Sequence, residues 1–209
     1  MVEQDKRYKE YPYKEKVGIR PVSWEVFHRL CKGLVQNIAK YDPDVIVGNG
    51  RGGLMAATLV SHMLQKDLFP IRISRRENNV IKHERPVWSV LPAKYLKRKK
   101  VLVVDEICDT GETLNMITAK CWEMKPADVK TAVLYSRVKG QGIPDYIGVI
   151  TEELIVNIWD SEIFDQAAKK FKFHPDYITG FQMQSLEIDD AFQLKIKPIK
   201  IAKGQVENK

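Results

Sequence analysis

VLVVDEICDTGETL, residues 101–114, is the stretch from which the fold can be predicted. Its four opening residues have the apolar, β-branched composition of a short buried strand. Two carboxylates follow, then a turn rich in hydroxyl groups, and residues 114–125 continue as an amphipathic helix that Pro126 ends. A turn at a helix N-terminus offers backbone N–H groups and the positive end of the helix dipole to an anion. The stretch therefore predicts a phosphate-binding turn at the end of a strand.

Two acids beside a phosphate site require a second ligand between them, because carboxylates repel an anion. Asp105 and Glu106 can accept hydrogen bonds from ribose hydroxyls, and Mg²⁺ prefers carboxylate oxygens. A sugar phosphate with magnesium satisfies all of these groups. The alternative is that the stretch binds no ligand and the two acids only solvate the end of the strand. The stretch closely resembles the phosphoribosyl-pyrophosphate (PRPP) motif of the type I phosphoribosyltransferases. That motif is an apolar run, two acids, two variable residues and Asp-Thr-Gly-x-Thr.

The resemblance implies an α/β fold, in which helices flank a central, mostly parallel sheet. It also implies a purine phosphoribosyltransferase of purine salvage, which uses PRPP, Mg²⁺ and a purine base and yields a nucleoside monophosphate and pyrophosphate. Asp105 and Glu106 are expected to hold the ribose and Mg²⁺, directly or through water. Asp109 is expected to act as general base, with a helix-capping carboxylate as the alternative. The remaining PRPP contacts of the turn are Thr110, Gly111, Glu112 and Thr113. The side chain of Glu112 must point away from the phosphate or be neutralised nearby.

A glycine-rich loop, GNGRGG at residues 48–53, joins a short strand at Asp44–Val47 to an apolar helix at Leu54–Leu64. This order satisfies the dinucleotide-binding fingerprint, so an NADP-dependent Rossmann oxidoreductase is one alternative function. That alternative leaves residues 101–114 unexplained. The loop also resembles the Arg-Gly-Gly-Leu pyrophosphate loop of the bacterial and archaeal 6-oxopurine enzymes. The resemblance implies that PRPP contacts Gly50, Arg51 and Gly52, and that Arg51 draws charge onto the departing pyrophosphate.

Predicted strands at residues 129–135 and 144–150 and the segment LIVNIWD at residues 154–160 resemble the base-binding end of the 6-oxopurine enzymes. The resemblance implies base contacts from Ser136, Arg137, Leu154 and Ile155. In the family, a lysine donates to the purine O6, and its position aligns with Ser136 or Arg137; Lys139 follows two residues later. The position of the aromatic residue that stacks on the base aligns with Leu154. An arginine donor suits a 6-oxopurine, whereas a serine oxygen and carbonyls suit adenine. Both kinds of base therefore stay open.

The phosphoribosyltransferase core is expected to span residues 1–160, with residues 1–22 as an extended N-terminal arm and Ser23 capping a helix that ends near Asp42. Residues 72–100 predict a mobile functional loop or a short hairpin. Residues 161–209 are expected to form a small C-terminal subdomain packed beside the base pocket, or else an oligomer contact. Its predicted elements are a helix at 161–173, a helix at 186–192 and an edge strand at 194–201.

The charge balance admits more than one class of partner. The chain has 34 Lys and Arg against 27 Asp and Glu, a net charge of +7, which suits anionic substrates and nucleic acid alike. A PRPP-sensing, nucleic-acid-binding regulator is therefore a second alternative, although no helix-turn-helix sequence precedes the core.

Cysteine spacing and hydropathy indicate the compartment. The three cysteines show no paired spacing, the N-terminus is too polar for a signal peptide, and no apolar run approaches the length that spans a membrane. We expect a cytoplasmic enzyme without a membrane partner. The resemblance implies a homodimer.

Overall fold

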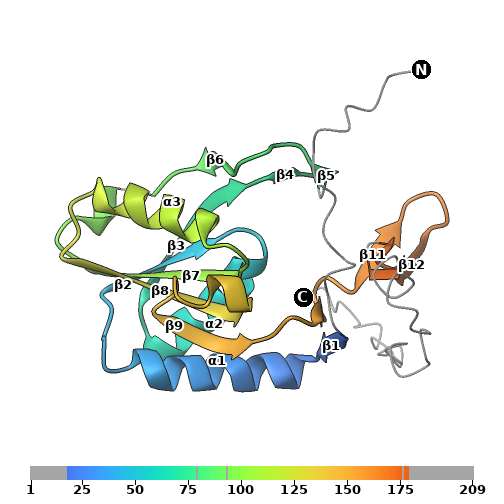
Figure 1. Ribbon diagram of the computed structural model, residues 1–209, viewed down its shortest axis with the longest axis horizontal. Helices are drawn as coiled ribbons and strands as arrows, with labels where there is room; N and C mark the ends of the chain where they lie inside the picture. The colour runs from blue at the N-terminus through green and yellow to red at the C-terminus, as the bar shows by residue number, and fades with distance from the viewer. Residues whose placement is uncertain (1–17, 79, 93, 176, 179–209) are drawn as a thin grey trace, which may run out of the picture.

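A six-stranded sheet forms the centre of the protein in a computed structural model that describes residues 18–78, 80–92, 94–175 and 177–178 (Figure 1). The strand order is β6-β3-β2-β7-β8-β9, and every pairing is parallel except that of β6 with β3. This arrangement confirms the predicted α/β fold with a mostly parallel sheet. The strands of the sheet and the helices that follow two of them are β2 (Val45–Asn49), α2 (Gly52–Leu64), β3 (Asp67–Ser74), β6 (Val87–Val90), β7 (Lys100–Cys108), α3 (Glu112–Trp122), β8 (Asp128–Ser136) and β9 (Tyr146–Ile150).

Helices cover both faces of the sheet, as the apolar runs of its central strands require. Successive side chains of a strand point to opposite faces. In β2, Ile46 packs with α1 (Trp24–Ile38) and α2, while Val45 and Val47 pack with α3. Figure 1 shows α3 on one side of the sheet and α1 and α2 on the other. None of the helices in the described part of the chain is long and apolar enough to span a membrane.

The N-terminal helix α1 begins where its sequence predicts. Ser23 is the N-cap, and its hydroxyl accepts a hydrogen bond from the N–H of Val26 at 3.2 Å. The residues of α1 that are buried recur at helical spacing, which confirms the predicted apolar stripe: Phe27, Cys31, Leu34 and Ile38. The helix therefore lies with one face against the sheet and the other in solvent.

Pairs of short strands lie outside the main sheet. β1 (Ile19–Val22) pairs in parallel with β10 (Leu154–Asn157), so the last part of the predicted arm is a strand instead of a free segment. Residues 1–17 lie outside the described residues. The predicted hairpin between residues 72 and 100 is formed by β4 (Arg76–Glu77) and β5 (Val80–Ile81). Short 3₁₀ helices at Lys94–Leu96 and Val138–Gly140 complete the connections.

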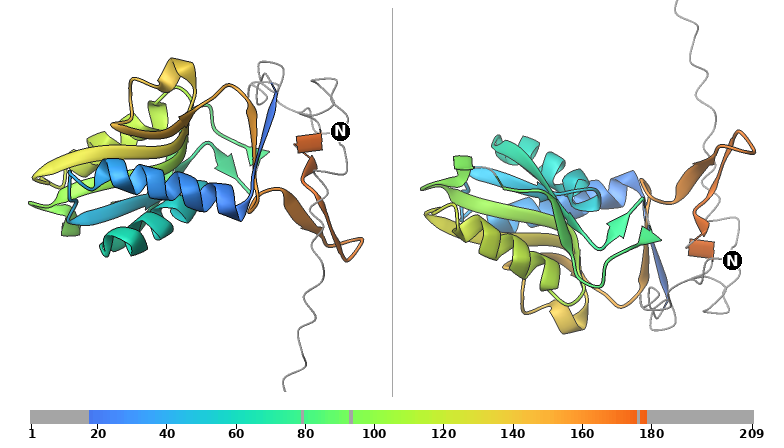
Figure 2. Two further views of the ribbon diagram at one scale, coloured as in Figure 1. Left: turned by 90° about the horizontal axis from the view of Figure 1, so that it is seen from below. Right: turned by 90° about the horizontal axis from the view of Figure 1, so that it is seen from above.

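The predicted helix at residues 161–173 is wrong. This segment forms the antiparallel hairpin β11 (Glu162–Asp165) and β12 (Lys170–Phe173), which stands apart from the main sheet in Figure 2. Asp165 accepts hydrogen bonds from the N–H groups of Ala167 and Ala168 and so closes the turn. Phe164 and Phe171 then lie opposite each other, with ring centroids 5.3 Å apart. The elements predicted at residues 186–192 and 194–201 lie outside the described residues.

Candidate active site

The carboxyl ends of β2, β3, β7 and β8 surround a cavity of about 1040 Å³. Open α/β sheets bind their ligands at this edge. The cavity brings together the glycine loop, the two acids of β7 and the turn before α3, as predicted from sequence. Of the predicted site residues, those that line it are Gly50, Arg51, Gly52, Asp105, Glu106, Asp109, Thr110, Gly111, Glu112, Thr113, Arg137, Leu154 and Ile155. Ser136 is not among the lining residues.

Asp105 is held at the end of β7 by a neighbouring strand. The Nδ2 of Asn49 donates to Asp105 Oδ2 at 3.0 Å, and the Oδ1 of Asn49 accepts from the N–H of Ile73 at 3.1 Å. The N–H of Glu106 donates to the other Asp105 oxygen at 2.8 Å. Asn49 therefore ties β2, β3 and β7 together at the cavity. Burial raises the pKa of Asp105 to about 6, although both hydrogen bonds act in the opposite direction.

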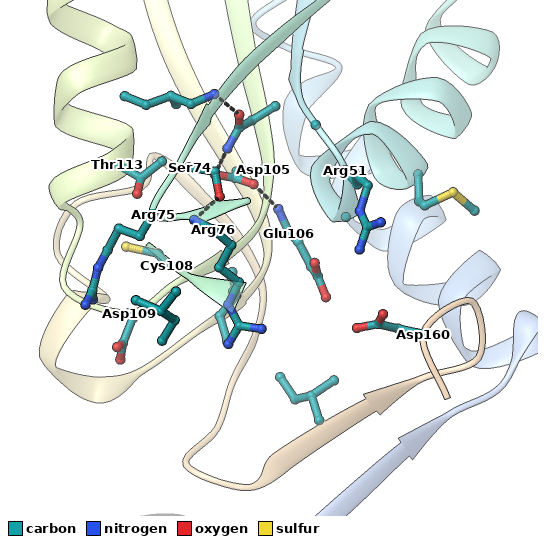
Figure 3. A pocket seen from close by; sticks show the side chains of 18 of the residues that line it. Arg51, Ser74, Arg75, Arg76, Asp105, Glu106, Cys108, Asp109, Thr113 and Asp160 are labelled. Carbon is teal, nitrogen blue, oxygen red and sulfur yellow. Dashed lines mark hydrogen bonds between the residues drawn. The ribbon is translucent and has the colours of Figure 1, made fainter. Parts of the chain in front are cut away.

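Glu106 faces the cavity itself. Its Oε1 accepts a hydrogen bond from Asn157, whose own Oδ1 accepts from the hydroxyl of Tyr135 at 2.8 Å. Burial raises the pKa of Glu106 to about 8, and the negative charges of Asp160 and Asp105 add to that rise. Figure 3 shows Arg51, Glu106 and Asp160 pointing into the same space. The positive charges of Arg76 and Arg51 offset part of this rise in pKa, and the acids can bind a cation or accept hydrogen bonds from hydroxyl groups.

The glycine loop packs directly against the two acids. A Cβ at Gly52 would collide with the carboxylate of Glu106, and a Cβ at Gly53 would lie 2.7 Å from Asp105 Oδ1. A larger residue at either position would displace an acid from the cavity. The two motifs of the sequence are thus halves of one site, and glycines are needed for this close approach.

The turn before α3 has the features of an anion site. Gly111 is its N-cap, with φ of 85°, a conformation that favours glycine. Glu112 forms an ion pair with Arg85, Nε to Oε1 at 2.8 Å, which confirms that the acid is neutralised nearby. Asp109 does not cap α3, because Gly111 is the N-cap residue. The Oδ1 of Asp109 instead lies 3.1 Å from Lys139 Nζ. The N–H of Glu112 donates to the hydroxyl of Thr110 at 3.4 Å, and no side chain caps the helix at Gly111, so the N-terminus of α3 can still face a phosphate.

At the base end, neither predicted polar contact is oriented as the sequence suggested. Arg137 is 1% exposed, and its Nη1 donates to the carbonyls of Thr151 at 2.7 Å and Glu153 at 2.6 Å. Ser136 is fully buried, and its hydroxyl donates to the carbonyl of Arg137 at 3.1 Å. Arg137 thus lines the cavity while bonding to backbone, and Ser136 lies behind it.

Several residues that line the cavity were not predicted as site residues: Asn49, Arg76, Asp160 and Tyr177. Asn157, which donates to Glu106 without lining the cavity, was also not predicted. Asn49 lies inside the glycine loop, and Asp160 ends the LIVNIWD segment, so a search for polar residues at strand ends could have found both. Nothing in the sequence pattern marks Tyr177, which reaches the site from the C-terminal segment.

Comparisons with known proteins agree with this geometry. The sequence-family model described as the phosphoribosyl transferase domain matches residues 21–167 of this chain. The purine phosphoribosyltransferase from Pyrococcus horikoshii Ot3 is 30% identical, with a TM-score of 0.61, and the match covers 68% of this chain and 94% of that chain. The chain therefore belongs to the phosphoribosyl transferase family and is a transferase. The type I fold predicted from the PRPP motif is confirmed, and family membership removes the Rossmann alternative.

Two further structures share the fold at lower identity. A hypothetical protein from Neisseria gonorrhoeae with bound ppGpp is 21% identical, with a TM-score of 0.57 and coverage of 79% of this chain and 96% of that chain. The Helicobacter pylori xanthine-guanine-hypoxanthine phosphoribosyltransferase is also 21% identical, with a TM-score of 0.55 and coverage of 68% and 91%.

Proposed function

We propose that this protein is a purine phosphoribosyltransferase of purine salvage. A purine ring nitrogen bonds to the anomeric carbon of PRPP, the bond from that carbon to pyrophosphate breaks, and a nucleoside 5′-monophosphate results. The observation that supports this function is that one cavity joins the glycine loop, the acids of β7 and the phosphate turn. The relative from Pyrococcus horikoshii Ot3 is described as a purine phosphoribosyltransferase, which supports the purine as acceptor.

Each part of the cavity has a role in this reaction. The turn Thr110–Thr113 and the N-terminus of α3 bind the 5′-phosphate. Asp105 and Glu106 hold the ribose hydroxyls, and Arg51 stabilises the charge that develops on the departing pyrophosphate. Asp109, at the end of β7, accepts the proton that the purine nitrogen loses. Arg51 and Asp109 are therefore the proposed catalytic residues.

The oxygen ligands at the cavity fit Mg²⁺. Burial and the nearby charges of Asp160 and Asp105 raise the pKa of Glu106, while the charges of Arg76 and Arg51 act in the opposite direction. In the described residues, no group of three or more His, Cys, Asp or Glu forms a metal site alone. We therefore propose that Asp105 and Glu106 hold Mg²⁺ together with oxygens of PRPP, directly or through water. Bound there, Mg²⁺ would neutralise charge on the pyrophosphate.

For the base, the contacts favour a 6-oxopurine over adenine. Ser136 and Arg137, the two candidate readers, are engaged with backbone carbonyls. Lys139 does not line the cavity, but its half-exposed ammonium lies 3.1 Å from Oδ1 of Asp109, which does line it and is the proposed proton acceptor. An ammonium can donate to the O6 of hypoxanthine, guanine or xanthine but has no acceptor for the amino group of adenine.

Pyrophosphate release tests the function directly. The protein is incubated with PRPP, Mg²⁺ and each of adenine, hypoxanthine, guanine and xanthine in turn. We expect release with at least one 6-oxopurine and a lower kcat/KM for adenine. Lys139→Ala should reduce kcat/KM for the 6-oxopurines, so that these values move closer to the value for adenine. Binding of PRPP without release with any base would instead favour a PRPP-sensing regulator.

A further inference from the structure

The C-terminal segment forms part of the cavity wall. The family match ends at residue 167, yet the cavity is also lined by residues of the β11–β12 hairpin and of the turn that follows it. Glu162 and Ile163 of β11 still fall within the match, whereas His174 and Tyr177 lie beyond it. This chain therefore supplements the common domain with a wall of its own.

Tyr177 is firmly placed in that wall. Its ring is 9% exposed and packs with Leu154 and Val156 of β10, and the ring centroid of Phe173 lies 5.9 Å away. Its N–H donates to the carbonyl of His174 at 3.0 Å. With ring and backbone both fixed, the hydroxyl can take only a narrow range of positions.

The hydroxyl of Tyr177 lies 3.0 Å from Asp160 Oδ2, to which it donates a hydrogen bond. Asp160 follows β10 in a turn closed by its own N–H and the carbonyl of Asn157, at 3.0 Å. Figure 3 shows the Asp160 carboxylate directed toward Glu106 and Arg51. Two carboxylates on one cavity repel each other, so a hydrogen-bond donor to Asp160 stabilises it in this position. Tyr177 supplies that donor from outside the common domain.

We propose that Tyr177 is a positioning residue whose hydroxyl holds Asp160 facing Glu106, so that the acids bind a divalent cation together with PRPP. The C-terminal segment is then a working part of the substrate site. This inference rests on the proposed function, because it takes PRPP and a divalent cation as the ligands.

Calorimetric titration of PRPP at a fixed Mg²⁺ concentration, without a purine base, tests the proposal in the absence of turnover. Tyr177→Phe keeps the packed ring and removes only the hydroxyl. The matched control is Tyr95→Phe, because Tyr95 is exposed and its hydroxyl lies 3.5 Å from Asp67, another aspartate. Asp160→Ala and the double variant Asp160→Ala/Tyr177→Phe complete the set, and thermal denaturation of each variant reports on folding.

We expect Tyr177→Phe to weaken PRPP binding about 10-fold, the size typical of a hydrogen bond to a charged group. Tyr95→Phe should bind like the wild type. In the Asp160→Ala background, Tyr177→Phe should have no further effect, because it acts through Asp160. In the turnover assay, the effect should fall on KM for PRPP and leave KM for the base unchanged.

Three outcomes overturn the proposal. Unchanged PRPP affinity of Tyr177→Phe, with or without a lower melting temperature, would leave Tyr177 with a packing role only. An equal loss of affinity in the wild-type and Asp160→Ala backgrounds would show that Tyr177 does not act through Asp160. If the wild type binds no PRPP in the presence of Mg²⁺, the proposed function fails, and this inference fails with it.

Discussion

Acidic side chains stand at both edges of the central sheet, and the two sets are bonded in different ways. At the amino edge, Asp145 precedes β9 and accepts hydrogen bonds from the N–H and hydroxyl of Thr131 at 2.8 and 2.9 Å. It also pairs with Lys130 at 2.8 Å. Although partial burial acts in the opposite direction, these contacts hold the pKa of Asp145 below its usual range. At the carboxyl edge, burial and neighbouring acids raise the pKa of Glu106.

The difference separates acids that stabilise the fold from acids that are kept for a ligand. A buried carboxylate without a compensating charge destabilises the folded state. Its place in the structure is then explained by what it binds, since functional sites often reduce stability. The charge of Asp145 is compensated by Lys130, whereas burial disfavours the charged forms of Asp105 and Glu106, and for Glu106 the charges of Arg76 and Arg51 offset only part of that effect. Substitutions at the carboxyl edge should therefore impair PRPP binding or catalysis, whereas substitutions at the amino edge should lower the free energy of unfolding.

The largest effect is expected for Asp109→Asn at the carboxyl edge. A general base typically contributes ~10²–10⁴-fold to the rate, so kcat should fall by that order while the PRPP dissociation constant changes little. Stopped-flow or coupled measurement of pyrophosphate release gives kcat, and calorimetry gives the binding constant. The same change at the amino edge, Asp145→Asn, is the control and should leave kcat unchanged. An unaltered kcat in Asp109→Asn would limit Asp109 to its ion pair with Lys139.

Glu106→Gln should weaken PRPP binding and stabilise the ligand-free protein. Loss of hydrogen bonds to a charged group should weaken the binding of PRPP with Mg²⁺ by about 10–100-fold. Asp105→Ala should also weaken it. At alkaline pH the free energy of unfolding of the ligand-free Gln variant should rise by about 0.5–2 kcal/mol, the usual size for such replacements.

The pH dependence of stability follows from the direction of the shift. The pKa of Glu106 is raised from 4.5 to about 8, so this group favours the folded state below pH 4.5 and loses that contribution as the pH rises through about 8. Glu106→Gln removes this dependence, and its advantage over the wild type should grow between pH 5 and pH 8. Urea denaturation at both pH values measures it. Parallel stability profiles for the two proteins would contradict the assigned burial of charge.

At the amino edge, Asp145→Ala should lower the free energy of unfolding and leave PRPP binding unchanged. Removing the acceptor leaves the N–H and hydroxyl of Thr131 without this partner, at a typical cost of about 1–3 kcal/mol. Because folding lowers the pKa of Asp145, its contribution is present at neutral pH and is lost as the pH falls through the folded-state value. Chemical denaturation at pH 7 and pH 3 should show a smaller difference from the wild type at pH 3 than at pH 7. A change in PRPP affinity would show that the edges are not independent.

Much of the fold could be predicted because the local sequence signals, apolar strand runs and a helix cap, match the elements that the folded sheet and helices require. The apolar runs of β2, β7 and β8 are buried on both faces, and Ser23 caps α1 through its own side chain. The PRPP motif and the glycine loop could be placed together because both follow parallel strands. Strand parity limited the base end, since adjacent side chains point to opposite sides: Arg137 lines the cavity and Ser136 does not.

The parts that could not be predicted depend on contacts between distant residues. The spacing of apolar residues at 161–173 fits a helix, but the Phe164–Phe171 pair and the Asp165 turn make a hairpin. Asn49 bonds to Asp105, 56 positions away, and Tyr177 bonds to Asp160, 17 positions away. Neither pairing is marked by local sequence, because a hydrogen bond between such distant residues exists only once the chain has folded.

The smallest effect is expected at Glu112, the carboxyl-edge acid that most resembles Asp145 because it has a cationic partner. Its ion pair with Arg85 is exposed, and such pairs contribute about 0–1 kcal/mol, so Arg85→Gln should hardly change the melting temperature. It does leave a negative charge beside the phosphate turn. We expect KM for PRPP to rise by up to about 5-fold at low salt, and less at high salt because ions screen exposed charges. In Arg85→Gln/Glu112→Gln the charge is absent, and KM should return toward the wild-type value. Failure of the double variant to recover would mean that Arg85 acts on PRPP itself instead of through Glu112.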